Sequence, residues 1–199
     1  VAEGVKPITT SPKTCLSSSR AKSQEGADAH TLAFTTAPKI NAAGRMGEAA
    51  SALALFSETD EKAVFDLSAR LTAYNQERQQ RCDELYAQAK AKLALRGAYG
   101  RVIMLWDESW NSGFVGIVAA RLAEEYGRPG ILFVNNGGTL KGPARSIEWV
   151  NIFEALRACS EFISEFGGHS QAAGVNVSEE NFALLEEAIP ASMFAPMRE

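Results

Sequence analysis

The stretch RVIMLWDESWNSGFVGIVAARLAEEYGRPGILFVNN, residues 101–136, decides the fold of this chain. It opens with the short apolar run RVIMLW and closes with a second run, PGILFVNN; both are typical of buried strands. Between them, residues 113–127 repeat apolar side chains at the spacing of an amphipathic helix. Strands that alternate with helices of about 10–15 residues predict an α/β layer.

The same alternation continues towards the C-terminus. GTLKGPARSI (residues 138–147) predicts a third strand, and AAGVNV (residues 172–177) predicts the last one. Asn151 can cap the helix that follows it, and Ser178 can cap a closing helix. We therefore expect residues 98–199 to form one α/β domain.

Residues 60–96 predict one long helix upstream of this domain. Apolar side chains recur there at steps of three or four, which gives a single stripe along a helix of about ten turns. Thr59 and Asp60 can cap its start, and Gly97 can end it. Such a length is typical of a helix that spans or links two lobes. One arm of a coiled coil is the alternative, although Arg78 interrupts the stripe.

The residues before this helix carry weaker signals. Residues 1–33 are rich in Thr, Ser, Lys and Gly without a lasting apolar period, which predicts a flexible connector. Pro38 disfavours helix directly before it. NAAGR, residues 41–45, is expected to open a helix, and residues 48–56 are expected to form a short buried one. Residues 34–97 as a whole are predicted to be a helical segment.

The composition is that of a soluble globular protein, 46% hydrophobic and 22% charged. No apolar run approaches the roughly 20 residues of a membrane span, and no signal peptide is recognisable. The net charge of −4 and the pI of about 5.4 argue against a surface that is basic as a whole, so any phosphate binding must be local. Because the chain begins with Val1 rather than Met, we expect a piece of a longer protein.

The sequence offers little for catalysis by metals or nucleophiles. Cys15, Cys82 and Cys159 are far apart, suit a reducing compartment, and are expected to be buried or bystander thiols. With two histidines and no HxxEH, DxD or DHH pattern, a di-metal centre cannot be assembled. Asp107 and Glu108 could form an acid/base pair, but neighbours in sequence usually point apart.

Four segments place glycine beside a residue that can hold an anion. They are NAAGR (41–45), WNSGFVGIVAARL (110–122), KGPARS (141–146) and FGGH (166–169). Glycine lets a backbone approach a ligand closely, and N–H groups at a helix start together with an arginine favour phosphate. Three of these segments fall at strand ends of the predicted α/β domain, where ligands usually bind.

Each segment also has a purely structural alternative. Arg45 can be a surface arginine in a salt bridge, and the glycines of residues 110–122 can serve helix–sheet packing alone. Gly142 can belong to a plain turn, and His169 can be a core histidine with satisfied hydrogen bonds. The combination of four segments is what favours a ligand.

Together these motifs resemble the RecJ family, the bacterial single-stranded-DNA-specific 5′→3′ exonucleases. APKINAAGR, WNSGFVGIVAARLAEEYGRP, KGPARSI and FGGHSQAAG occur in the order and spacing of that family, and the resemblance runs from about Phe34 to Ile189. It implies a long connector helix that leads into a nucleic-acid-binding DHH-associated α/β domain, residues 98–199, with a mixed sheet flanked by helices. GGH alone is shared more widely by DHH-associated domains.

The resemblance also implies which residues bind DNA phosphates. Arg45 resembles an arginine that contacts a backbone phosphate near the cut. Arg145 resembles an arginine that helps recognise the 5′-phosphate, and His169 resembles a histidine at the substrate phosphate. The complete implied set is Arg45, Asn111, Gly142, Arg145, Ser146, Gly167, Gly168 and His169.

Two positions depart from the family pattern. RecJ usually has a serine where this chain has Pro143, which offers neither a hydroxyl nor an N–H group. RecJ usually has a histidine where this chain has Asn111, which can hydrogen-bond but cannot carry charge or shuttle a proton. Recognition of the 5′ end is the property that these changes affect.

The resemblance implies activity only for a longer protein. In RecJ a DHH domain binds Mn²⁺ or Mg²⁺, and none of its ligands occurs here. We therefore expect no catalytic residue and no metal in this chain, and an inactive fragment. The implied partners are single-stranded DNA and, in repair, a single-strand-binding protein and a DNA helicase; the implied location is cytoplasmic, without a membrane.

Two other functions stay open. A DHH-family oligonucleotide phosphodiesterase or phosphatase would share these motifs, although the long helix and NAAGR favour RecJ; substrate length would separate the two. A non-catalytic nucleic-acid-binding scaffold is favoured by the changes at Pro143 and Asn111. A DHH triplet in the sequence upstream of this chain would exclude the scaffold.

Overall fold

The structure is a computed structural model that describes residues 29–97 and 100–192. The chain divides into two compact units, residues 1–80 and 81–199, and helix α5 (Glu61–Arg96) contributes to both. The division falls inside this helix, whereas the sequence suggested residue 97, because the last turns of α5 pack against the α/β domain. In the described ranges, no helix is both long and apolar enough to cross a membrane.

The first unit is helical. Ala29–Thr31 (α2), a π-helical turn Leu32–Thr36 (η1) and Ala37–Arg45 (α3) follow one another without a break. Ala49–Ser57 (α4) confirms the predicted short helix, but the helix is only partly buried, since Leu53 and Phe56 are exposed. The core of this unit joins α3, α4 and the start of α5 through Ala43, Ala52, Leu55, Val64 and Leu71.

Three local predictions for this unit are wrong. Pro38 does not interrupt the helix, since Ala37 before it is helical with φ −59° and ψ −39°. Pro38 lies just after the π-helical turn η1, in which the helical register is already shifted because the N–H group of Ala37 donates to Leu32 O. NAAGR therefore ends a helix instead of opening one. Residues 29–33, expected to end a flexible connector, are helical, and residues 1–28 lie outside the described ranges.

Helix α5 begins and ends as predicted. The N–H group of Ala63 donates to Asp60 Oδ2 over 2.9 Å, so Asp60 caps the start. Gly97 follows the helix with a φ of 70°, a conformation that favours glycine. The predicted apolar stripe is confirmed as its buried side, with Val64, Leu71, Cys82, Leu85, Ala89 and Leu93 all buried.

The second unit contains a five-stranded mixed sheet in the order β1–β2–β3–β5–β4, which confirms the predicted fold class. The strands are Ile103–Asp107 (β1), Gly130–Asn136 (β2), Thr139–Arg145 (β3), Glu165–Gly168 (β4) and Ala172–Ser178 (β5). Strands β1 and β2 are parallel, and the other neighbours are antiparallel. The short edge strand β4 was not predicted, because two of its four residues are glycines.

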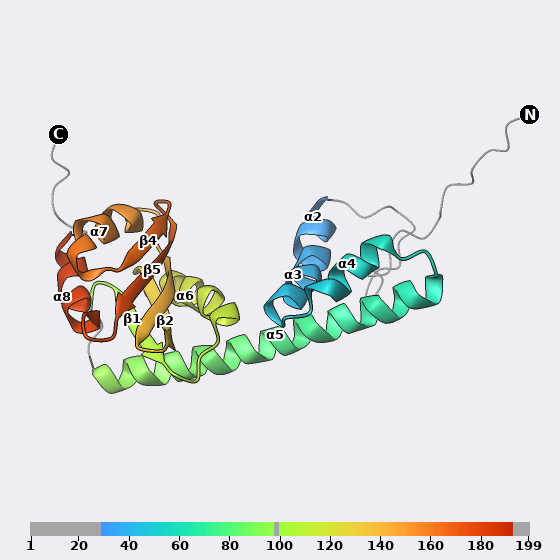
Figure 1. Cartoon of the computed structure of the whole chain (residues 1–199), viewed down its shortest axis with the longest axis horizontal. Helices are drawn as coiled ribbons and strands as arrows, with labels where there is room; N and C mark the ends of the chain where they lie inside the picture. Colours follow the sequence, from blue (N-terminus) through green and yellow to red (C-terminus); the bar gives the residue numbers. More distant parts are fainter. Residues whose placement is uncertain (1–28, 98–99, 193–199) are drawn as a thin grey trace, which may run out of the picture. The chain divides into compact units, whose positions relative to one another are not determined.

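Helices cover the sheet on both sides (Figure 1). Ser112–Tyr126 (α6) lies on one side, and Ile152–Ala158 (α7) and Phe182–Ser192 (α8) lie on the other. Between α7 and β4, residues Ser160–Phe162 form a 3₁₀ turn. The predicted cap at Asn151 is confirmed, since its Oδ1 accepts from the N–H group of Glu154. Ser178 does not cap α8: its Oγ accepts from the N–H group of Asn181 in the turn before that helix begins at Phe182.

The two faces of the sheet differ. The face under α7 and α8 forms the main core, with Phe133 fully buried and its ring edge-on to that of Phe182 at 5.6 Å. We call this the closed face. On the opposite side, α6 contacts β2 and β3, while Gly167 on β4 and Gly174 on β5 are exposed. We call this second side the open face.

Candidate nucleic-acid interface

A groove of about 410 Å³ lies on the open face, beside the start of α6. Ser112 and Val115 of α6 form one wall. Strands β3, β5 and β4 form the rest of the lining, with Lys141, Gly142, Pro143, Glu165, Phe166, Gly167, Gly174, Val175 and Asn176. Of the eight residues predicted for the site, two line this groove, Gly142 and Gly167.

The floor of the groove is a row of three residues, two glycines and one proline. Gly174 pairs with Pro143 on one side and with Gly167 on the other, so the three lie next to one another across β3, β5 and β4. A Cβ atom at Gly167 would meet nothing within 4 Å, and one at Gly174 would find its nearest neighbour 4.0 Å away. The missing side chains therefore leave room for a ligand rather than for another part of the chain.

Gly142 and Gly168 are required by packing instead. A Cβ atom at Gly142 would lie 2.6 Å from Leu132 O and 2.9 Å from the ring of Phe133. At Gly168, where φ is 146°, it would lie 2.5 Å from Ala172 O. Gly142 and Gly168 therefore let neighbouring strands approach each other. The two glycines before His169 thus have different roles: Gly167 is open to the groove, and Gly168 allows the close contact within the β4–β5 hairpin.

Basic side chains follow the floor along β3. Lys141, Pro143 and Arg145 alternate along the strand and so share the open face. Arg145 Nη1 donates to Ala144 O over 2.9 Å, and its Nη2 lies 3.4 Å from where a Cβ of Gly116 would be. Gly116 of α6 thus makes room for the guanidinium group, which holds a fork of donors suited to phosphate.

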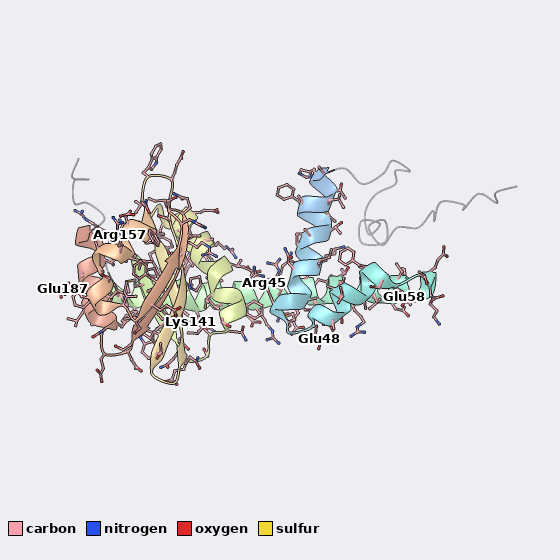
Figure 2. The ribbon with its side chains drawn as sticks, turned by 45° about the horizontal axis from the view of Figure 1, so that its top comes forward. Arg45, Glu48, Glu58, Lys141, Arg157 and Glu187 are labelled. Atoms are coloured by element: carbon pink, nitrogen blue, oxygen red, sulfur yellow. The ribbon has the colours of Figure 1, made fainter. Side chains whose placement is uncertain are left out.

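The other end of the groove carries both charges. Lys141, labelled in Figure 2, pairs in register with Asn176. The Nδ2 atom of Asn176 donates to Glu165 Oε2 over 2.8 Å. A cation, an amide and a carboxylate therefore follow one another across three strands, so this end can bind groups other than phosphate.

Asn111 caps α6 beside the groove. Its Oδ1 atom accepts from the N–H group of Gly113 over 2.8 Å, and its carbonyl oxygen accepts from Phe114 over 3.0 Å. The cap uses acceptors of Asn111, and its amide nitrogen can still donate to a ligand. The asparagine that replaces the family's histidine thus caps the helix with its oxygen, and the two N–H groups of its amide can donate to a ligand.

Ser146 and His169 lie in two turns that are tied together. The hydroxyl of Ser146 donates to Val150 O over 2.6 Å, and its N–H group donates to Gln171 O over 2.9 Å. His169 is exposed in the turn between β4 and β5, and its N–H group donates to Ala172 O over 2.8 Å. Since Arg145 pairs with Ala172, the structure brings Arg145, Ser146 and His169 to one end of the sheet.

Arg45 belongs to the first unit. It is exposed in the last turn of α3, and Figure 2 shows it just before the turn that leads to Glu48. A helix C-terminus presents carbonyl groups rather than N–H groups. The expected helix-start anion site is therefore absent at NAAGR, and a phosphate contact there would rest on the guanidinium group of Arg45.

Asp107 stabilises the sheet edge and is not a candidate base. Its Oδ2 atom lies 2.8 Å from Lys92 Nζ, and both the N–H group and the hydroxyl of Ser109 donate to Oδ1. The hydrogen bond from Lys92, followed by those from Ser109, lowers the pKa of Asp107 to about 2. Such a carboxylate stays ionised near neutral pH and is a weak proton acceptor.

The described residues do not provide a metal site. Across residues 29–97 and 100–192, no group of three or more His, Cys, Asp or Glu side chains could hold a metal ion. Cys82 and Cys159 are buried and form no disulfide, as expected. Cys15 lies outside the described ranges. The divalent metal that the resemblance implies therefore does not fit the described part of this chain.

Comparison with known proteins identifies the class of this domain. Residues 97–193 match the DHHA1 domain family, so the second unit is built on a DHHA1 domain. The chain is 34% identical over 157 residues to the single-stranded-DNA-specific exonuclease RecJ of Bacillus subtilis, covering 78% of this chain and 20% of that protein. It is 35% identical over 171 residues to RecJ of Thermus thermophilus, covering 84% and 25%.

Solved structures agree with these relatives. The crystal structure of Thermus thermophilus RecJ in complex with Mg²⁺ superposes with a TM-score of 0.72 at 32% identity, over 84% of this chain and 26% of that one. A crystal structure of the same protein in complex with Mn²⁺ gives the same TM-score. The chain is a relative of RecJ and spans about a quarter of the length of these proteins.

Several residues of the groove were not predicted as site residues: Ser112, Lys141, Glu165, Gly174 and Asn176. Lys141 could have been found from the sequence. It lies two residues before Pro143 and four before Arg145 in a predicted strand, and residues at even spacing in a strand share one face. Glu165 and Asn176 could not, since they meet only through the pairing of β4 with β5.

Proposed function

We propose that this chain is the part of a RecJ-like single-stranded-DNA-specific exonuclease that holds the DNA, with the open face of its DHHA1 domain as the phosphate-binding surface. The observation that carries this proposal is the groove whose floor, Pro143–Gly174–Gly167, has no side chain at its two glycines. The same face also carries Lys141 and Arg145. A bare floor admits a sugar–phosphate chain, and the basic side chains can neutralise it locally despite the overall charge of −4.

The residues have distinct parts in this proposal. Arg145 donates to the 5′-terminal phosphate, and His169, exposed at the same end of the sheet, contacts the next phosphate. Lys141 and Ser112 hold the strand where it leaves the groove. Pro143 replaces a donor by an apolar ring, so the guanidinium group of Arg145 carries more of the phosphate binding here than a serine-containing loop would require.

The experiment is fluorescence anisotropy of the 199-residue chain with labelled single strands in EDTA. The strands bear either a 5′-phosphate or a 5′-hydroxyl. We expect tighter binding of the phosphate form, and a loss of about 10-fold to 150-fold for Arg145→Ala, as for a charge-assisted hydrogen bond of about 1.5–3 kcal/mol. His169→Ala should act in the same direction.

Arg157→Ala is the matched control. Arg157, labelled in Figure 2, lies on α7, which covers the closed face. It pairs with Glu154. Arg157→Ala removes the same charge as Arg145→Ala. If only the net charge of the chain mattered, the two variants would lose the same binding affinity. Equal binding of both strands, unchanged by Arg145→Ala and by His169→Ala, would refute the proposed phosphate site.

In the longer protein, a divalent metal would supply the hydrolytic chemistry; the solved RecJ relatives contain Mg²⁺ or Mn²⁺. We propose that this chain contributes binding and orientation only, because its described residues contain no group suited to hold a metal. Incubation of the chain with Mn²⁺ and end-labelled single strands should release no nucleotides. Release that follows the chain through purification would contradict this part.

A further inference from the structure

We infer that Trp149 is a stacking platform for a nucleobase of the bound single strand, an inference that rests on the proposed function. Trp149 is 84% exposed. Within the described part of the second unit, no other tryptophan or phenylalanine is exposed. A large aromatic side chain is buried on average, so an indole left in solvent beside a candidate DNA site has both of its faces available.

The turn that carries Trp149 is held in place. The N–H group of Val150 donates to Ile147 O over 3.1 Å, which closes a turn with Trp149 at its tip. The hydroxyl of Ser146 donates to Val150 O over 2.6 Å and braces the same turn. A fixed backbone lowers the entropy that a stacking side chain loses on binding.

The turn is also tied to the phosphate-binding end of the sheet. Ser146 donates its N–H group to Gln171 O, and Ile152 donates its own to Ser170 O, each over 2.9 Å. Gln171 and Ser170 belong to the turn that begins at His169. Trp149 thus projects from a turn joined on one side to Arg145 along the chain and on the other to His169 through hydrogen bonds.

The local charge favours a base over a phosphate at this turn. Glu148 is exposed directly beside Trp149. Its carboxylate repels phosphate groups, whereas the π-face of an indole accepts any base. With phosphates at Arg145 and His169, the base of a neighbouring nucleotide is the part of the strand that can reach Trp149. Base–aromatic stacking tolerates every sequence, which suits a protein that binds single strands without base preference.

The test is an abasic scan of a 5′-phosphorylated single strand, bound to the 199-residue chain in EDTA and followed by anisotropy. We expect Trp149→Ala to weaken binding about 5-fold to 150-fold, the range of one lost base–aromatic stack. One abasic position should weaken the wild type similarly but leave Trp149→Ala unchanged. Trp149→Phe should keep most of the affinity, and Trp149→Leu should not, because leucine has no π-face.

Leu184→Ala is the control, because Leu184 is a partly exposed apolar residue of α8, which covers the closed face. If Trp149→Ala binds with wild-type affinity while Arg145→Ala binds weakly, the stacking platform is overturned and the proposed function stands. The exposed indole would then be suited to contact another protein instead. Equal losses at every abasic position in the wild type and Trp149→Ala would also overturn it. Absence of any single-strand binding by the wild type would overturn both proposals.

Discussion

The two faces of the DHHA1 sheet are built from the same strands and yet use their residues in opposite ways. On the closed face, large apolar side chains such as Phe133 and Leu140 fill the space under α7 and α8. On the open face, side chains are removed at Gly167 and Gly174, and Lys141 and Arg145 remain beside them. The closed face stabilises the fold, and the open face leaves a bare surface on which a ligand can lie.

This contrast makes glycine the most informative residue of the domain. Gly142 is a glycine because the ring of Phe133 occupies its space, and Gly167 is a glycine although nothing occupies its space. The same residue type therefore indicates packing in one case and access in the other. Only the surroundings of the Cβ position separate the two, and substitutions can test that separation.

The largest expected effect is on the closed face. Phe133→Ala should lower the free energy of unfolding by about 3–5 kcal/mol, because a fully buried ring is replaced by a cavity beside Phe182. Urea denaturation of the 199-residue chain measures this. Lys141→Ala on the open face is the comparison and should change the free energy by no more than about 0.5 kcal/mol. Similar losses for both would break the distinction between the faces.

The next largest effect separates the glycine pair. Gly168→Ala should destabilise by about 2–3 kcal/mol, since φ is 146° and the new Cβ would meet the backbone of Ala172. Gly167→Ala, one residue earlier, should cost no more than about 0.5 kcal/mol because its Cβ position is open. Unfolding in urea compares the two variants directly. A larger loss at Gly167 than at Gly168 would contradict the assignment.

We expect Asp107 to contribute to the stability of the fold and not to the binding of DNA. Its pKa is about 2 in the folded chain against 3.8 ordinarily, so the ionised group stabilises the fold above about pH 4 and this contribution is lost as the pH falls towards 2. After allowance for solvent around a partly exposed pair, Asp107→Asn should cost about 1 kcal/mol at about pH 7 and progressively less below about pH 4. Urea unfolding across this range checks it, with Glu108→Gln as the control. A pH-independent loss would exclude the ion pair as its cause.

Gly174→Val should have the smallest effect on stability and should still clearly weaken the binding of single-stranded DNA. Gly174→Val should change the free energy of unfolding by no more than about 0.5 kcal/mol, because the position is open and valine suits a strand. It should nevertheless weaken single-strand binding about tenfold, since a side chain on the floor would overpack the contact by about 1–3 kcal/mol. Anisotropy with a 5′-phosphorylated strand measures this. Wild-type binding would place the DNA elsewhere on the domain.

The candidate site was only partly visible in the sequence. Arg145 and His169 were named through the motifs, and the structure brings them to one end of the sheet. NAAGR was expected at a helix start and lies at a helix end, because the helix begins before Pro38. Trp149 was not predicted as a site residue, since a single aromatic residue in a turn carries no signal until its exposure is known.

The sequence by itself determined four of the five strands, the long helix α5 and the approximate positions of α4, α6, α7 and α8, because hydrophobic period, caps and glycine act within a few residues of one another. It also determined the relationship to RecJ, through four ordered motifs. Only the tertiary structure decided that β4 forms an edge strand, which of two adjacent glycines faces the groove, and which side of β3 carries Lys141 and Arg145. Those properties depend on pairing between residues far apart in the chain, and no local pattern encodes which partner a strand will meet.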